Sequence, residues 1–253
     1  MESFQTHLYN QMADGKLSDY TANEILKVSR QFVEWLIDHE RIDPVRNLRK
    51  MTIQVSPKEP TPVPLADVKR LLEGGTDRTR LYTLLAINCG YLDTDIGTLL
   101  KSEVNWTEGR ISRKRHKTRH NTTNTPKVDY KLWGETFGLL TAQCAKDGEL
   151  VLLNERGKPL TRQFIDDEGN VQDIRNIKTT MKRLRKKLGV SATFAQLRKT
   201  SVSMLEGHDV FCRYSQYFLG HAPRTTAEKH YIQPSKDQFD KAIDWLAGQY
   251  GLK

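Results

Sequence analysis

The spacing of apolar residues changes several times along the chain, and these changes predict the order of the elements. Repeats of three and four residues indicate amphipathic helices, whereas shorter alternating runs indicate strands. Two strands separated by a polar stretch, residues 116–125, are interpreted as a basic β-hairpin. The predicted fold class is therefore mostly α with a small antiparallel sheet. The predicted helices cover residues 21–39, 65–73, 77–88, 94–101, 131–145 and 171–188, and the predicted strands cover 110–114, 126–130 and 150–153.

The first 50 residues are expected to be helical but to hold little core of their own. Thr21 to Glu24 has the form of a capping box, and an apolar face with Phe32 and Trp35 follows it. The pattern ends near His39, and Phe32 and Trp35 are expected to be core residues. A segment this short buries little surface, so it either packs on a partner or is the remnant of a larger helical domain.

A proline-rich segment predicts the domain boundary. Residues 56–64 contain four prolines, which make a stiff and extended linker. The chain after it alternates helices and turns as far as a final amphipathic helix. The predicted organisation is a small helical segment at 1–55, the linker at 56–64, and a larger domain at 65–253.

Composition excludes several classes of protein. Hydrophobic residues make up 37% of the chain, as in an ordinary globular protein. No apolar run approaches the roughly 18 to 20 residues of a membrane span, and the N-terminus lacks the pattern of a signal peptide, so a cytoplasmic location is expected. The three cysteines form no CxxC pair, which argues against a structural metal or a disulfide framework.

Positive charge is concentrated in two segments. The net charge is +9, with nine Lys or Arg against three acids over 101–131, and seven with no acid over 175–187. Such clusters can neutralise phosphates and release counterions, which favours a polyanionic partner such as DNA. The charges over 175–187 also fit a solvated helix face, and that alternative stays open.

The residues with the clearest chemistry lie between 197 and 231. Leu197-Arg198-Lys199-Thr200 is followed by Leu219-Gly220-His221 and then by His230-Tyr231. Cleavage of a phosphodiester without metal requires a nucleophile, cations on the non-bridging oxygens, and a general acid for the leaving oxygen. An arginine, two histidines, a hairpin lysine and a tyrosine could fill these roles. The sequence shows no cluster of carboxylates of the kind that would indicate a two-metal nuclease.

This order of motifs resembles the C-terminal region of tyrosine recombinases, the phage-type integrases. The segment 89–96 resembles the family's G-x-R-x-S-E-L turn, and 113–118 resembles its hairpin ending in Lys-Thr. The order and spacing hold from about Pro64 to Trp245, so the resemblance implies a catalytic domain at 65–253 and a partial helical core-binding (DNA-binding) domain at 1–55. In detail, NCG, RKRxKT, FLGHAPRT and EKHY resemble integrases of planctomycete-type bacteria most.

The resemblance implies a role for each matching residue. Tyr231 would form a 3′-phosphotyrosyl bond, Arg198 would clamp the scissile phosphate, and His221 would hydrogen-bond it. Lys117 would be the general acid. No cofactor is implied; the partners would be duplex DNA and further copies of the chain, in a synaptic tetramer. Candidate auxiliary groups are Lys199, His230, Arg113 and Arg115, and the residues expected to contact DNA are Arg113, Lys114, Arg115, Arg119, Arg175, Lys178 and Lys182.

Three departures from the family pattern leave alternatives open. Leu92 stands where the family has its first arginine, and Ala195 stands where it often has His or Lys. The N-terminal part is about half the usual size, and no arm-binding domain is visible. One alternative is a DNA-binding protein on a recombinase scaffold that does not cut. Another is a monomeric enzyme resembling type IB topoisomerases, which relaxes supercoils.

Overall fold

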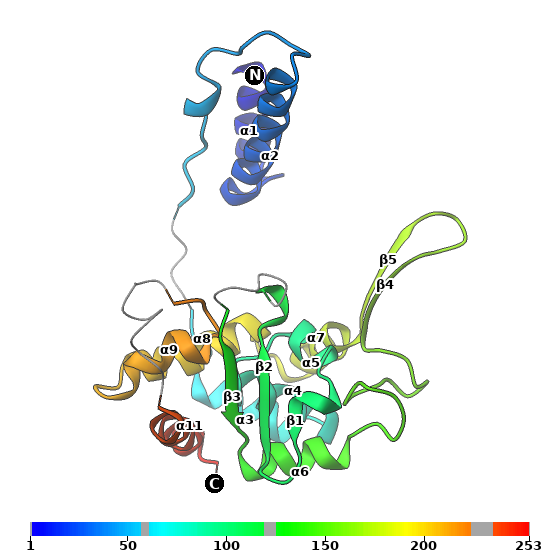
Figure 1. Cartoon of the computed structure of the whole chain (residues 1–253), viewed down its shortest axis with the longest axis vertical. Helices are drawn as coiled ribbons and strands as arrows, with labels where there is room; N and C mark the ends of the chain where they lie inside the picture. Colours follow the sequence, from blue (N-terminus) through cyan, green and yellow to red (C-terminus); the bar gives the residue numbers. More distant parts are fainter. Residues whose placement is uncertain (1, 57–60, 119–124, 224–234, 253) are drawn as a thin grey trace. The chain divides into compact units, whose positions relative to one another are not determined.

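The computed structural model describes residues 2–56, 61–118, 125–223 and 235–252. It divides into two compact units, Met1–Glu59 and Pro60–Lys253. The prediction of a mostly helical chain with small antiparallel sheets is confirmed (Figure 1).

The first unit contains α1 (Glu2–Ala13), α2 (Asp19–Asp38) and a 3₁₀ turn, η1 (Leu48–Lys50). Helix α2 starts two residues earlier than predicted, because the hydroxyl of Ser18 accepts a hydrogen bond from the backbone N–H of Thr21 at 3.1 Å. The helix ends at Asp38 with His39 as its C-cap, which agrees with the predicted end near His39. A small core of buried side chains holds this unit together, namely Leu8, Ala22, Leu26, Met51 and Ile53.

The expectation that Phe32 and Trp35 are core residues is wrong. Their exposed fractions are 60% and 50%, and their rings stack on each other with centroids 6.3 Å apart. The buried side of α2 is instead the one that carries Ala22 and Leu26. The apolar stripe read from the sequence is thus real, but it lies on the solvent side of this two-helix unit.

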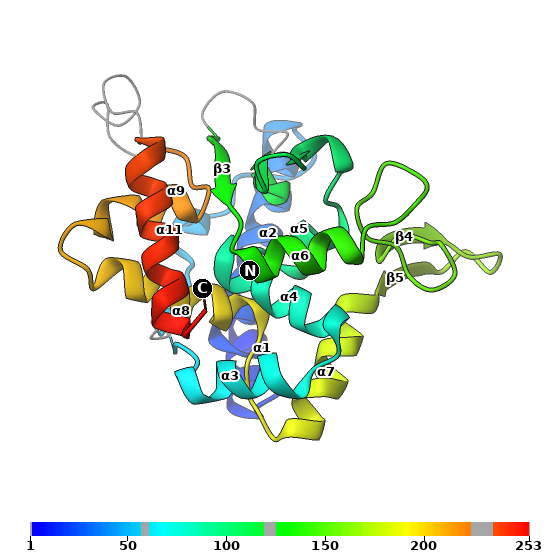
Figure 2. The same ribbon diagram turned by 90° about the horizontal axis from the view of Figure 1, so that it is seen from below.

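The second unit is built around α4 (Asp77–Asn88), which is buried along almost its whole length. Helices α3 (Leu65–Gly74), α6 (Gly134–Ala142), α7 (Asn176–Leu188) and α8 (Phe194–Glu206) pack against it (Figure 2). Leu81, Leu84 and Leu85 of α4 are fully buried, and the polar side chains of Thr83 and Asn88 are buried with them, so this helix lies inside the core. The unit ends with α11 (Lys236–Tyr250), whose apolar face packs on α3, α4 and α8.

The predicted β-hairpin is present as part of a three-stranded antiparallel sheet. Strand β2 (Arg110–Lys114) pairs with β1 (Val104–Asn105) on one side and with β3 (Lys127–Lys131) on the other. Ile111 lies opposite Tyr130, and both side chains are buried. At its end, β2 leads into a 3₁₀ turn, η3 (His116–Thr118), and the helix predicted over 94–101 is the shorter α5 (Asp93–Gly97) followed by η2 (Lys101–Glu103).

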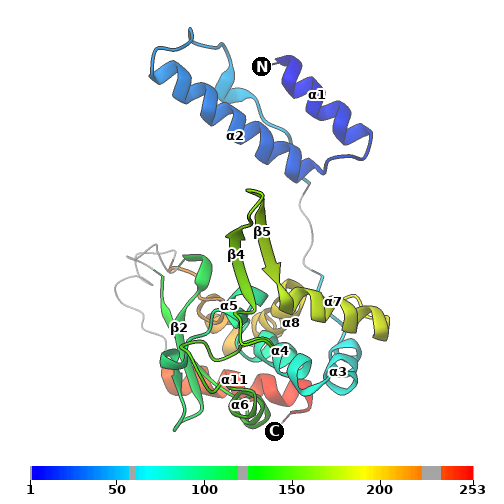
Figure 3. The same cartoon turned by 90° about the vertical axis from the view of Figure 1, so that its right-hand side faces the viewer.

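A second hairpin was not predicted. Strands β4 (Thr161–Ile165) and β5 (Val171–Arg175) pair antiparallel and project from the body of this unit (Figures 1 and 3). The predicted helix over 171–188 therefore begins only at Asn176. Val171 and Ile174 fit a helical spacing as well as a strand, so the periodicity alone could not separate the two. Two short elements, η4 (Phe211–Tyr214) and α9 (Ser215–Phe218), connect α8 to the segment that contains His221.

Candidate functional site

The site forms around Arg198, in the second turn of α8. Thr193 and Gln196 form a reciprocal capping box that fixes where this helix starts. Arg198 is only 8% exposed, and its guanidinium donates to two backbone carbonyls, Gly90 at 3.0 Å and Leu219 at 2.5 Å. Among the described residues Arg198 forms no salt bridge. Burial lowers the pKa of Arg198 and the nearby charge of Arg115 lowers it further, which outweighs the opposite effects of Tyr130 and Asp95.

One carbonyl partner of Arg198 belongs to the turn between α4 and α5. Gly90 has φ +63°, and a Cβ there would lie 2.9 Å from the ring of Phe218. Only glycine fits this turn without strain, for both reasons. The turn thus presents its carbonyl to Arg198 and lets α9 approach closely.

The other carbonyl partner comes immediately before Gly220-His221. The Gly220 N–H donates to the Tyr217 carbonyl, and the His221 N–H donates to the Gln216 carbonyl at 3.1 Å, which closes the end of α9. The His221 ring is oriented by a 2.9 Å hydrogen bond between its Nδ1 and the side chain of Gln216. Arg198 and His221, which are 23 residues apart, are therefore joined through one turn.

The end of the β2–β3 hairpin reaches the same place. A methyl group at Gly220 would lie 3.5 Å from the Cβ of Arg115, so the chain after β2 lies against this turn. The backbone N–H of His116 donates to Asp95 in α5 at 3.1 Å, which fixes the start of η3. Lys117 is exposed on η3. The structure thus brings Arg198, His221 and Arg115 together, with Lys117 on the adjoining turn.

Arg113 is used differently from its neighbours on the hairpin. Its side chain is 2% exposed, donates to the Asp95 carbonyl at 2.6 Å, and lies 3.6 Å from the carboxylate of Glu103. It also stacks over the ring of Tyr91, 5.7 Å from the centroid. Arg113 thus holds α5 on the sheet, and its guanidinium is turned away from solvent.

The remaining candidates are scattered over the surface or lie outside the described residues. Lys178, Lys182 and Lys199 are exposed, and Lys114 is half-buried at the end of β2. Arg175 donates to Asp173 at 2.9 Å and to Thr94 at 3.1 Å. Hydrogen bonding to Asp173 raises the pKa of Arg175. The candidates that lie outside the described residues are Arg119, His230 and Tyr231.

Beside Arg198 there is a pocket that the sequence analysis did not foresee. It has a volume of about 530 Å³ and is lined by Leu92, Ala195 and three cations of α7. One of these cations, Arg185, was missed. Its signal was its spacing, because it follows Lys178 by seven residues and Lys182 by three, which places all three on one helix face.

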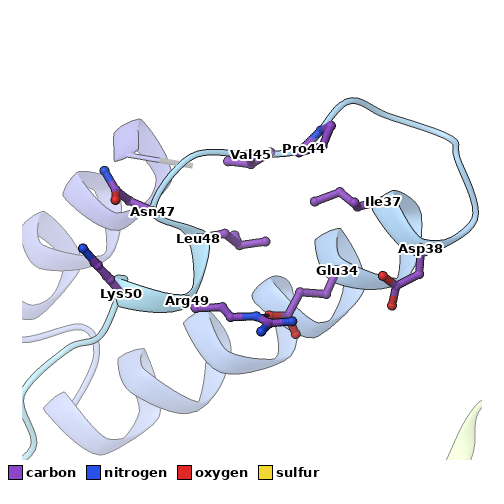
Figure 4. Close-up of a pocket in the computed structure, with 9 residues that line it drawn as sticks. All are labelled: Glu34, Ile37, Asp38, Pro44, Val45, Asn47, Leu48, Arg49 and Lys50. Atoms are coloured by element: carbon purple, nitrogen blue, oxygen red, sulfur yellow. Dashed lines mark hydrogen bonds and ion pairs between the residues drawn. The ribbon is translucent and has the colours of Figure 1, made fainter.

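A smaller pocket, of about 350 Å³, lies within the first unit between α2 and η1 (Figure 4). Arg49 and Glu34, which line it, form an ion pair at 3.3 Å. Arg49 is thus neutralised by Glu34, and the pocket contains none of the residues that the sequence indicates as catalytic, so this pocket is not the candidate site.

Two searches of the described residues give negative findings. No group of three or more His, Cys, Asp or Glu side chains is placed so that it could hold a metal ion. No helix in the described ranges combines the length and the apolar character needed to cross a membrane.

Solved structures with the same fold were found, whereas no protein-family model and no curated protein matches the chain. The integrase from mycobacterium phage Brujita is 17% identical with a TM-score of 0.53, over 96% of this chain and 77% of that one. A lambda integrase dimer bound to a COC' core site is 16% identical with a TM-score of 0.63, over 93% and 82%. The Tn1549 transposon integrase in complex with transposon right end DNA is 13% identical with a TM-score of 0.62, over 97% and 85%. The second unit therefore has the fold of a tyrosine recombinase catalytic domain.

Proposed function

We propose that this chain is a site-specific DNA recombinase that cuts and rejoins duplex DNA through a 3′-phosphotyrosyl intermediate. One observation carries the proposal: the buried guanidinium of Arg198 is positioned by two carbonyls, from the Gly90 turn and from the residue before Gly220-His221, and no carboxylate among the described residues is hydrogen-bonded or ion-paired to it. A buried cation without a counter-ion is unfavourable unless an anion meets it in the functional state. On this fold, the anion would be a DNA phosphate.

The proposed reaction is a pair of transesterifications. The hydroxyl of Tyr231 attacks phosphorus and forms a P–O bond, while the bond from phosphorus to the 5′ oxygen of the next nucleotide breaks. Lys117 gives its proton to that 5′ oxygen, and the proton that the tyrosine hydroxyl loses passes to solvent, from which Lys117 is protonated again. A 5′ hydroxyl then attacks the phosphotyrosine, which restores the phosphodiester and the free tyrosine. One bond forms for each that breaks, so no cofactor and no high-energy donor are needed.

Two cations and one histidine would stabilise the charge that builds on the non-bridging oxygens. Arg198 supplies a guanidinium fork and Arg115 a second charge next to it. His221 would donate a hydrogen bond from the turn after α9. Removing one such donor typically costs roughly a hundredfold to a thousandfold in rate.

The similar structures also suggest how copies of the chain would assemble on DNA. Some of the similar structures are a dimer on a core site and a lambda integrase tetramer bound to a Holliday junction. We propose that this chain also works as a tetramer on two synapsed sites, in the nucleoid of a bacterium and on behalf of a mobile element. In motif detail the resemblance points to planctomycete-type integrases. The first unit would close around the duplex as a partial core-binding domain.

The test begins with the DNA site, which is selected from a randomised pool of duplexes by repeated binding. The selected duplex is then nicked next to each candidate cleavage position, so that the short cut strand diffuses away and traps any covalent complex. A protein–DNA adduct on denaturing gels is the expected result. Firm binding with no adduct at any nick position would overturn the proposed cleavage.

A second candidate function is DNA binding on this scaffold without strand cleavage. Leu92 favours it, because an apolar side chain stands where the resembling family has an arginine. Under this alternative, the duplex would bind with the salt sensitivity typical of phosphate contacts, yet nicked duplexes would never become attached to the protein.

A further inference from the structure

The pocket beside Arg198 contains both departures from the family pattern and a cluster of cations. Its wall includes both positions at which the chain departs from the resembling family, Leu92 and Ala195. Leu92 comes two residues after Gly90, and Ala195 comes one helical turn before Arg198, so the pocket adjoins the Arg198 site. Helices α5, α7 and α8, which border it, lie next to one another in two views (Figures 1 and 3).

The rim of this pocket is strongly cationic. Lys178, Lys182 and Arg185 recur along one face of α7, the two lysines exposed and the arginine half-buried. One carboxylate also lines the pocket: Asp93, which lies 4.0 Å from Lys178 and 3.5 Å from Arg175. Three cations against this single acid leave the pocket positive.

Backbone groups add to that charge. The pocket includes Thr193, Phe194 and Ala195, the cap and first residues of α8. The first amide groups of a helix have no acceptor within the helix, and the helix dipole favours an anion at this end. The capping box uses the N–H groups of Thr193 and Gln196, so the N–H groups of Phe194 and Ala195 are the ones left for a ligand.

The floor of the pocket is apolar, formed by Leu92, Met181, Ala192 and Phe194. A free anion would gain nothing from such a floor, whereas a sugar would pack on it. We propose that the pocket binds one backbone phosphate of the duplex together with its deoxyribose. Lys182, Arg185 and the start of α8 hold the phosphate, next to the one that Arg198 meets. This site deepens the proposed function and supplies the positive charge that Leu92 does not.

The test replaces single phosphates of the selected duplex, one at a time, by neutral methylphosphonates and measures the affinity of each. Three proteins are compared: wild type, Lys182→Ala/Arg185→Ala, and the control Arg183→Ala/Lys187→Ala. The control loses the same charge from the same helix, but neither residue lines this pocket. Circular dichroism and thermal melts verify that each protein is folded.

One position is expected at which the neutral phosphate weakens wild type and the control, but not Lys182→Ala/Arg185→Ala. The slope of log affinity against log salt should also fall by about 0.9 in the pocket variant, the value for one lost phosphate contact. Equal losses of affinity in both double variants at every methylphosphonate position would overturn the proposed phosphate site. A wild-type protein that does not bind duplex DNA would overturn it as well. Because binding is read without cleavage, absence of a covalent adduct would overturn the proposed recombinase and leave this result standing.

Discussion

Two buried arginines of the second unit have opposite surroundings. Arg110 on β2 is 6% exposed and Arg198 on α8 is 8% exposed, so both guanidinium groups are largely shielded from solvent. Arg110 donates to the carboxylates of Asp129 and Asp240, both at 2.8 Å. Arg198 donates only to backbone carbonyls within the part of the chain that the structure describes.

The difference appears in the direction of each pKa. Burial alone would lower the pKa of Arg110, but its hydrogen bonds to Asp240 and Asp129 outweigh this and raise it. For Arg198, burial prevails and the pKa is lowered. A buried cation with its own carboxylates stabilises the fold, whereas a buried cation whose hydrogen bonds go only to carbonyls is the one expected to meet an anionic ligand. The surroundings of a charge therefore indicate its function better than its position in the sequence.

The largest expected effect is on stability, from Arg110→Ala. This change leaves Asp240 without Arg110 and leaves Asp129 only Lys236, at 3.9 Å, and breaking a buried pair typically costs about 3 to 5 kcal/mol. Chemical denaturation should show that loss in the free energy of unfolding. Arg183→Ala, at an exposed position of α7, should change it by no more than about 0.5 kcal/mol. Similar losses of unfolding free energy in Arg110→Ala and Arg183→Ala would show that the buried ion pairs of Arg110 do not stabilise the fold.

The next effect is on cleavage, from Arg198→Ala. The rate of adduct formation should fall roughly a hundredfold to a thousandfold, as for other donors to a developing oxyanion. The loss of unfolding free energy should be smaller than for Arg110→Ala, because removing Arg198 strands no carboxylate. Rates at saturating DNA, combined with denaturation curves, separate the two. An Arg198→Ala protein that cuts at the wild-type rate would contradict the assignment.

Alkaline pH should destabilise the core that surrounds Arg198. Burial raises the pKa of Cys89, Tyr91 and Tyr130 well above their ordinary values of 9.0, 10.0 and 10.0. Above pH 9 the unfolded chain therefore loses protons that the folded chain keeps, and stability falls as pH rises, by about 1.4 kcal/mol per pH unit for each group beyond its ordinary pKa.

Tyr91→Phe offers a matched check on this pH dependence. The Tyr91 hydroxyl is buried and has no hydrogen-bond partner among the described residues, so its loss costs little at neutral pH. Denaturation between about pH 9 and 11 should give a shallower loss of stability for this variant above its ordinary pKa of about 10. Identical pH profiles for wild type and Tyr91→Phe would show that burial of this hydroxyl is not the cause.

The smallest effect is stabilisation by an anion. Inorganic sulfate at ten times its dissociation constant should raise the free energy of unfolding by about 1.4 kcal/mol, if it binds to the guanidinium of Arg198. Thermal melts at constant ionic strength, with chloride as the comparison salt, measure this. Arg198→Ala should lose the stabilisation and Arg183→Ala should keep it. Equal stabilisation of both variants would indicate general surface binding.

Much of the fold followed from the sequence, because most periodic segments of the second unit are buried on the side that their pattern predicts. The N-terminal unit differed. The apolar stripe of α2 was visible, but nothing in a periodicity says whether a partner element is present to cover Phe32 and Trp35. The β4–β5 hairpin was missed because Ile174 continues the three- and four-residue spacing of the apolar residues in α7, so β5 looked like the first turn of that helix.

The candidate site was predictable where motifs fix backbone geometry, as for Gly90, Arg198 and Gly220-His221. How deeply the hairpin arginines are buried was not predictable from their charge alone. Arg113 and Arg115 look alike in the sequence, yet the first is buried with Ile111 on one face of β2. Strand alternation could have shown this burial, since residues two apart share a face. The pocket lined by Arg185 depends on how α7 packs beside α5, which no local pattern contains.

The central claim is that Tyr231 becomes joined to DNA. Its most direct test is to trap the adduct on a nicked duplex, digest protein and DNA, and locate the attached nucleotide by tandem mass spectrometry. The predicted result is a nucleotide linked through its 3′ phosphate to Tyr231, and no adduct with Tyr231→Phe. A nucleotide on any other residue, or an adduct that persists in Tyr231→Phe, would contradict the account.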